Sequence, residues 1–70
     1  MASTIEDSDL TKEAIVYLEG SSPGPVPTHA TIIEALRDIK VLPEEDQRVR
    51  VIKVKAKPPF CYEDFKEWLT

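Results

Sequence analysis

A chain of 70 residues with a net charge of −4 is one small domain, and its overall charge opposes attraction of the whole surface to DNA or RNA. The single cysteine and the single histidine exclude an internal disulfide, and a zinc site of Cys and His ligands, within one chain. No apolar run approaches the roughly 20 residues of a membrane helix, and the lack of cysteine pairs fits a reducing compartment. We therefore expect a soluble, cytoplasmic protein without a membrane partner.

The N-terminal residues 1–9 are polar and acidic. A segment with so little apolar surface cannot offset the entropy lost on ordering, so it predicts a flexible, disordered acidic arm. The remaining residues, 10–70, are expected to form a single α/β domain.

Residues 9–20 fit two kinds of element. As a strand, residues 14–18 offer β-branched and aromatic side chains bounded by Gly20, which is typical of a covered strand. As a helix, the segment would place four apolar side chains on one stripe, and the pattern slightly favours the strand. Three prolines within residues 21–27 then exclude regular structure and indicate a stiff loop.

The clearest element is a helix over about residues 29–40. Thr31 and Glu34 fit a capping box, with Thr28 as an alternative cap one turn earlier. Pro43 bars continuation of the helix. The helix would direct a stripe of apolar side chains at the core, namely Ile32, Ala35, Leu36 and Ile39.

Basic and apolar residues alternate over residues 48–57, which is the period of a strand. The alternation slips once, where Val51 and Ile52 are adjacent. A β-bulge at this point would return the apolar residues to one face. It would also place five cations on the other face: Arg48, Arg50, Lys53, Lys55 and Lys57.

Residues 61–70 predict a short amphipathic helix, whose apolar side carries Tyr62, Phe65, Trp68 and Leu69. The element order predicts an α+β fold: a β-α-β unit with parallel strands and a right-handed crossover, followed by this helix. Two strands make a poor sheet, so a third strand at residues 41–42, a second copy or a partner would complete it.

Isolated reactive side chains give no self-contained chemical site. Cys61 lies between two aromatic residues, which favours a core position over a nucleophile. His29 opens the predicted helix, where a surface role is expected. The acids of residues 44–46 and 63–67 favour solvation, and no glycine-rich phosphate loop is present. We expect no enzyme activity, metal or cofactor.

Two surfaces are candidates for binding. The five cations of residues 48–57 could protect a sheet edge, dock on an acidic protein or follow a nucleic-acid backbone. The aromatic stripe is either core or an anchor in a partner's groove. The residues predicted to bind a partner are therefore Arg48, Arg50, Lys53, Lys55, Lys57, Tyr62, Phe65 and Trp68.

The stretch Ile15 to Ile52 resembles the β-α-β unit of the 4-oxalocrotonate tautomerase family, through Leu18-Glu19-Gly20, a helix, and Val49-Arg50-Val51-Ile52. In that family an N-terminal proline at the start of the first strand is catalytic. No proline matches that position here, so the resemblance implies a fold without the activity. The chain is also similar in size, charge and pattern to small acidic inhibitors that phages encode.

These observations predict a small intracellular protein-binding adaptor or regulator, of a kind that includes viral and phage inhibitors of host proteins. Its partner is expected to be a protein with an acidic surface. The alternative is a nucleic-acid-associated protein that uses residues 48–57, and the third interpretation is a tautomerase-like fold without the catalytic proline. A homodimer is compatible with each of them.

Overall fold

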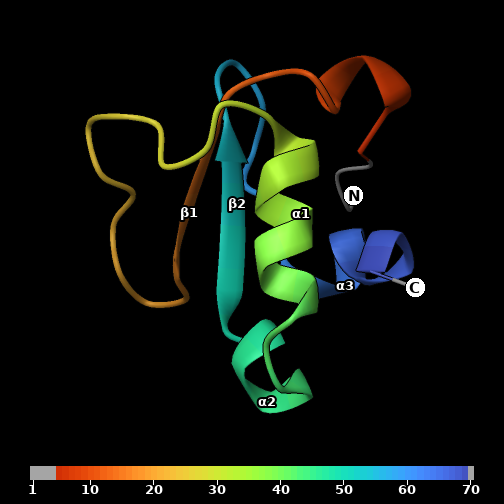
Figure 1. The fold of residues 1–70 in the computed structure, drawn as a ribbon. Coiled ribbons are helices and arrows are strands. Elements are labelled where there is room, and N and C mark those ends of the chain that lie inside the picture. Colours follow the sequence, from red (N-terminus) through yellow and green to blue (C-terminus); the bar gives the residue numbers. More distant parts are fainter. Residues whose placement is uncertain (1–4, 70) are drawn as a thin grey trace.

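The computed structural model describes residues 5–69 (Figure 1). Along the chain, a short 3-10 turn, η1, precedes the first strand, and the longest helix comes after the first strand and before the second. The C-terminal part forms one turn of α-helix that continues as a 3-10 turn. The elements are η1 (Asp7–Asp9), β1 (Ala14–Leu18), α1 (Ile32–Lys40), α2 (Glu44–Gln47), β2 (Arg50–Val54), α3 (Tyr62–Phe65) and η2 (Lys66–Leu69).

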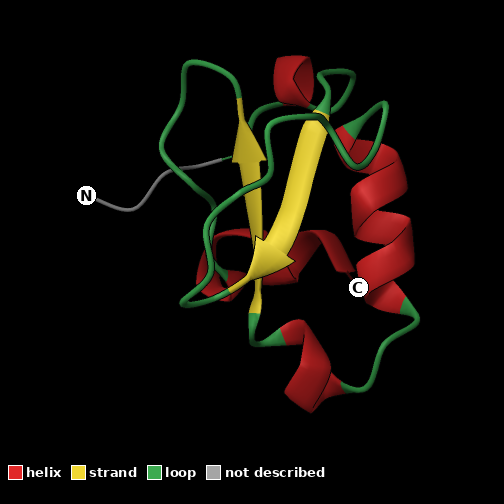
Figure 2. Ribbon diagram, turned by 90° about the vertical axis from the view of Figure 1, so that its left-hand side faces the viewer, coloured by secondary structure: helices red, strands yellow, loops and turns green. Residues whose placement is uncertain are grey.

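The two strands form an antiparallel sheet, with Ala14 opposite Val54 and Leu18 opposite Arg50. Helix α1 packs beside this sheet (Figure 2). The prediction of a strand at residues 14–18 is confirmed, and so is the mixed α/β composition. The prediction of parallel strands is wrong, and with it the tautomerase-like β-α-β topology.

The loop of residues 21–27, the proline loop, explains the antiparallel pairing. It leaves the end of β1 through a turn in which Gly20 has a φ of +89°, and it projects away from β2 (Figure 1). It then returns to the start of β1, where the Ala14 N–H donates to the His29 carbonyl at 3.0 Å. Helix α1 therefore begins beside the start of β1 and runs in the same direction, which leaves β2 to run back.

Helix α1 begins where the capping pattern predicts. The Thr31 hydroxyl accepts a hydrogen bond from the Glu34 N–H at 3.2 Å, and the Glu34 carboxylate accepts from the N–H of Ala30. The predicted apolar stripe faces the core, which confirms the helical interpretation. The core cluster contains Ile5, Ala14, Ile32, Ala35, Leu36, Ile39, Ile52, Val54, Phe60 and Phe65.

The described part of the predicted arm, residues 5–9, is packed against the domain. Ile5 is buried in the core, and the Asp9 side chain is fully buried. This corrects the prediction of a loose, disordered segment, because one apolar side chain and one paired carboxylate anchor it. The other residues of the predicted arm, 1–4, lie outside the described residues.

Strand β2 contains no bulge, because its register against β1 is continuous from residue 50 to residue 54. Val51 and Ile52 are both buried, and successive side chains of a strand point to opposite faces. The slip in the sequence pattern therefore reflects a strand that is covered on both faces, not a bulge that collects its apolar residues on one.

The outer edge of β2 is covered in part by the chain itself. Ile52 and Phe60 exchange two backbone hydrogen bonds, of 3.0 and 2.7 Å. Residues 41–42 follow α1 as a turn and not as the third strand that was considered. Within residues 5–69, no helix is long and apolar enough to cross a membrane.

Candidate functional site

The structure does not bring the five predicted cations onto one face. Arg48 caps the end of α2, 3.5 Å from the Glu44 carboxylate, and Arg50 and Lys53 point to opposite faces of β2. Lys55 and Lys57 lie in the turn that follows the strand. The predicted basic face is therefore wrong as a single surface, because only residues 50–54 keep the geometry of a strand.

Two of these cations serve the fold itself. The Lys53 ammonium donates to the carbonyls of Val54 and Lys57, and so holds the turn after β2. The Lys57 ammonium reaches the Asp9 carboxylate, at 2.7 Å. Neither ammonium is free to serve as a point of contact for a partner.

Asp9 is the centre of a clasp that also includes Lys12 and Lys57. Its carboxylate accepts from Lys57 at 2.7 Å, from Lys12 at 3.0 Å and from the Glu6 N–H at 3.0 Å. The hydrogen bond with Lys57 lowers the pKa of Asp9 far below its usual range and outweighs the opposing effect of burial. The same bond raises the pKa of Lys57. The clasp joins the N-terminal segment to the turn after β2.

The predicted aromatic residues divide between core and surface. Phe65 is fully buried and Tyr62 packs edge-on against it, with ring centroids 5.8 Å apart. Phe65 is therefore not available to a partner, which corrects its assignment as a binding residue. Trp68 is 38% exposed, so the C-terminal segment both packs on the core and leaves one large aromatic ring at the surface.

Trp68 borders an open hollow of about 300 Å³ between η2 and α1, which we call the Trp68 hollow. Its apolar wall combines Trp68 with Ile33, which is 46% exposed, and with the partly buried Leu10. The buried Leu36 contributes to the same hollow. Its lining also includes two exposed cations, Arg37 and Lys40, and none of its lining residues is acidic.

The charges of the Trp68 hollow differ from those of the clasp. Within residues 5–69, neither Arg37 nor Lys40 forms an ion pair with another side chain. The two acids of α1 are engaged elsewhere, since Glu34 caps the helix and Asp38 binds His29. Neither cation was predicted as a binding residue, although their i, i+3 spacing on the predicted helix placed them on one face.

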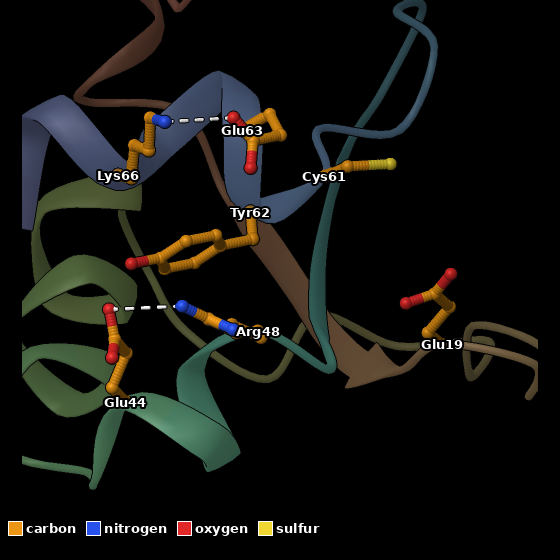
Figure 3. Close-up of a pocket in the computed structure, with 7 residues that line it drawn as sticks. All are labelled: Glu19, Glu44, Arg48, Cys61, Tyr62, Glu63 and Lys66. Atoms are coloured by element: carbon orange, nitrogen blue, oxygen red, sulfur yellow. Dashed lines mark hydrogen bonds and ion pairs between the residues drawn. The ribbon is translucent and has the colours of Figure 1, made fainter.

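A second, more polar hollow of about 630 Å³ lies where α2, α3 and the end of β1 meet (Figure 3). Its two cations are neutralised within it, because Arg48 binds Glu44 and Lys66 binds Glu63 at 2.8 Å. The Tyr62 ring lies between these two ion pairs in Figure 3. Glu19 also lines this hollow, so the lining contains one more acid than cations and does not favour an anionic ligand.

Cys61 lies at the edge of the same polar hollow and is exposed, which corrects the prediction of a core position. In Figure 3 its sulfur points away from the ring of Tyr62. Within residues 5–69, no three side chains of His, Cys, Asp or Glu converge as metal ligands.

A third groove, of about 850 Å³, runs between the proline loop and the turn after β2. Its walls include Ile15 and the three prolines, and Ala56 lines it with a φ of +68°, a conformation that is unfavourable for alanine. Two of the lysines that line it are bound within the fold: Lys12 binds the Asp9 carboxylate, and Lys53 donates to a backbone carbonyl of the turn after β2. The groove is apolar, and its charges do not select one kind of ligand.

Thr28, His29 and Asp38 form a hydrogen-bonded chain that resembles a proton relay. The His29 Nε2 donates to the Asp38 carboxylate at 2.6 Å, and its Nδ1 lies 2.8 Å from the Thr28 hydroxyl. That hydroxyl also accepts from the Val16 N–H at 2.8 Å, and it lies 3.3 Å from the Ala14 carbonyl. These hydrogen bonds hold the end of the proline loop against β1 and α1. Thr28 lines none of the three hollows.

No protein-family model matches the chain, and no curated protein or solved structure matches it. The Trp68 hollow is the site that the geometry favours, because it combines exposed apolar surface with cations that the fold does not neutralise.

Proposed function

We propose that the chain is a non-enzymatic protein-binding module, an adaptor or regulator that engages its partner through the Trp68 hollow. The observation that carries this proposal is the exposure of Trp68 beside Ile33 and Leu10 in one hollow. Exposed apolar groups gathered at one place, and Trp above all, are typical of the centre of a protein interface.

The distribution of cations supports a protein partner over a nucleic acid. The basic residues of 48–57 do not line one face, and two of them are bound inside the fold. A continuous groove of cations that could follow a phosphate backbone is not found within residues 5–69. Of the predicted binding residues, Trp68 remains in the proposed binding surface. The rest of that surface is formed by α1, η2 and Leu10 and not by the basic residues 48–57.

The test uses the folded chain and a random peptide library displayed on phage. Selected peptides are titrated by dye anisotropy and by the emission of Trp68, the only tryptophan of the chain, which shifts to shorter wavelength when its ring is covered. We expect Trp68→Ala and Ile33→Gln each to weaken binding by about tenfold or more, as for residues at the centre of an interface.

Val41→Ala is the matched control, because Val41 is 79% exposed and lies outside the hollow. It should leave peptide affinity unchanged. Urea unfolding of every variant separates lost binding from lost folding. Selected peptides that bind both hollow variants as tightly as the parent chain would show that the Trp68 hollow is not the docking site.

A further inference from the structure

We propose that the Trp68 hollow takes an acidic peptide segment, with a bulky apolar side chain seated against Trp68 and Ile33 and with carboxylates that pair with Arg37 and Lys40. This inference rests on the proposed function and adds the chemistry of the partner. It depends on the lining of the hollow, which combines apolar side chains with two cations and contains no acid.

The apolar part of the hollow selects one large side chain. Its volume of about 300 Å³ is at the lower limit of cavities that enclose small molecules, and it is open to solvent along α1 and η2. Leu10, Leu36 and Ile33 supply aliphatic surface in the same hollow as the Trp68 ring. An apolar anchor placed here would cover Trp68 and remove its exposed surface from water.

The two cations of the hollow select the charge of the segment. Arg37 and Lys40 are three residues apart on α1, and side chains at this spacing lie on one helix face about 5–6 Å apart at their Cβ atoms. Both are exposed, and neither is paired with an acid within residues 5–69. Two carboxylates one helical turn apart in a partner segment would reach both cations.

Two other occupants are less well matched. Single-stranded nucleic acid stacks on aromatic rings, but the hollow offers one ring beside aliphatic side chains, on a chain with a net charge of −4. A second copy of the chain would have to place an acidic segment, such as α2, in the hollow of the first. Both occupants give results in the test that differ from those of an acidic peptide.

The experiment repeats the random-peptide selection on three proteins: the parent, Arg37→Glu/Lys40→Glu, and the matched control Arg48→Glu/Lys55→Glu. The two double variants carry the same change in charge, and all four residues are exposed. We expect peptides selected on the parent and on the control to be rich in Asp and Glu around an apolar residue. The Arg37/Lys40 variant should lose this excess, and should bind the parent's peptides about tenfold more weakly.

Several results would overturn the inference. Peptides that depend on Trp68 but show no excess of acids would contradict it and leave the proposed function standing, whereas a library without Trp68-dependent binders would contradict both. An oligonucleotide that displaces the bound peptide at a lower concentration than an unlabelled copy of that peptide would indicate that the occupant is a nucleic acid. A dimer in sedimentation that Trp68→Ala abolishes would point to a second copy. If the reversal variant unfolds, Arg37→Gln/Lys40→Gln replaces it, with the same expected loss of acid preference.

Discussion

The lysines of the Asp9 clasp and the cations of the Trp68 hollow carry the same charge but are used differently. Lys12 and Lys57 bind a buried carboxylate and join two distant segments of the chain. Arg37 and Lys40 lie on α1 without a partner acid in the described chain. The comparison teaches that the alternation of basic residues along a strand does not identify a binding face, because the fold decides which charges it neutralises.

The largest expected effect in this comparison comes from Asp9→Asn. The substitution removes the charge that Lys57 and Lys12 share, and we expect the free energy of unfolding to fall by about 2–3 kcal/mol. This decrease in the free energy of unfolding is smaller than the decrease expected when a fully buried ion pair is broken, because both ammonium groups are partly exposed to water. Urea unfolding followed by circular dichroism measures it.

Asp7→Asn is the control for Asp9→Asn, since Asp7 is exposed in the same 3-10 turn. It should change the free energy of unfolding by no more than about 0.5 kcal/mol. Equal losses in the two variants would mean that the clasp does not stabilise the N-terminal segment.

A pH titration tests the clasp without leaving the parent sequence. The pKa of Asp9 is lowered in the fold, so its stabilising contribution is complete above the pKa of an unfolded aspartate, about 4. The contribution is lost as the pH falls below that value towards the folded pKa. We expect the urea midpoint of the parent to decrease between about pH 4 and pH 2 more steeply than that of Asp9→Asn.

A comparison of two neighbouring lysines tests the clasp from its other side. Lys57→Gln should lower the urea midpoint, because Asp9 loses its closest ammonium group. Lys55→Gln should leave the midpoint unchanged, because Lys55 is exposed and no ion pair holds it within residues 5–69. In the background of Asp9→Asn, the effect of Lys57→Gln should shrink, and a double-mutant cycle with no coupling would argue against the pair.

Only a small effect on folding is expected at the Trp68 hollow. Arg37→Gln/Lys40→Gln removes two exposed charges from the last turn of α1, where cations are favoured by the helix dipole and where neither forms an ion pair within residues 5–69. The free energy of unfolding should change by about 0.5 kcal/mol or less in 0.15 M salt. A loss as large as that of Asp9→Asn would show that these cations are structural, and the contrast between the two regions would disappear.

Local patterns in the sequence predicted β1 and α1. The strand at residues 14–18 and the apolar stripe of α1 are confirmed, because each depends on neighbours within a few residues. The direction of β2 was predicted wrongly. It follows from the return of the proline loop to Ala14, a contact between residues that no local pattern relates.

The candidate site was predicted only through Trp68. The sequence pattern could not distinguish buried Phe65 from exposed Trp68, because an amphipathic pattern places both on one apolar side and does not give the depth to which each side chain is buried. Arg37 and Lys40 lie within the best predicted helix, but the longer run of cations at residues 48–57 is the stronger charge pattern in the sequence. The burial of Asp9 could not be predicted from the local sequence either, because its partner Lys57 is 48 residues away along the chain.

The antiparallel sheet also has a consequence for how the chain folds. Its two strands pair residues as distant as Ala14 and Val54, and α1 and the proline loop lie between them. The chain loses conformational entropy when this long loop closes, and the contacts between the strands can compensate for that loss only after closure. Such a topology therefore folds more slowly than a bundle of helices that are neighbours in sequence. We expect α1, whose backbone hydrogen bonds join residues close in sequence, to be ordered early and the sheet to form in the rate-limiting step.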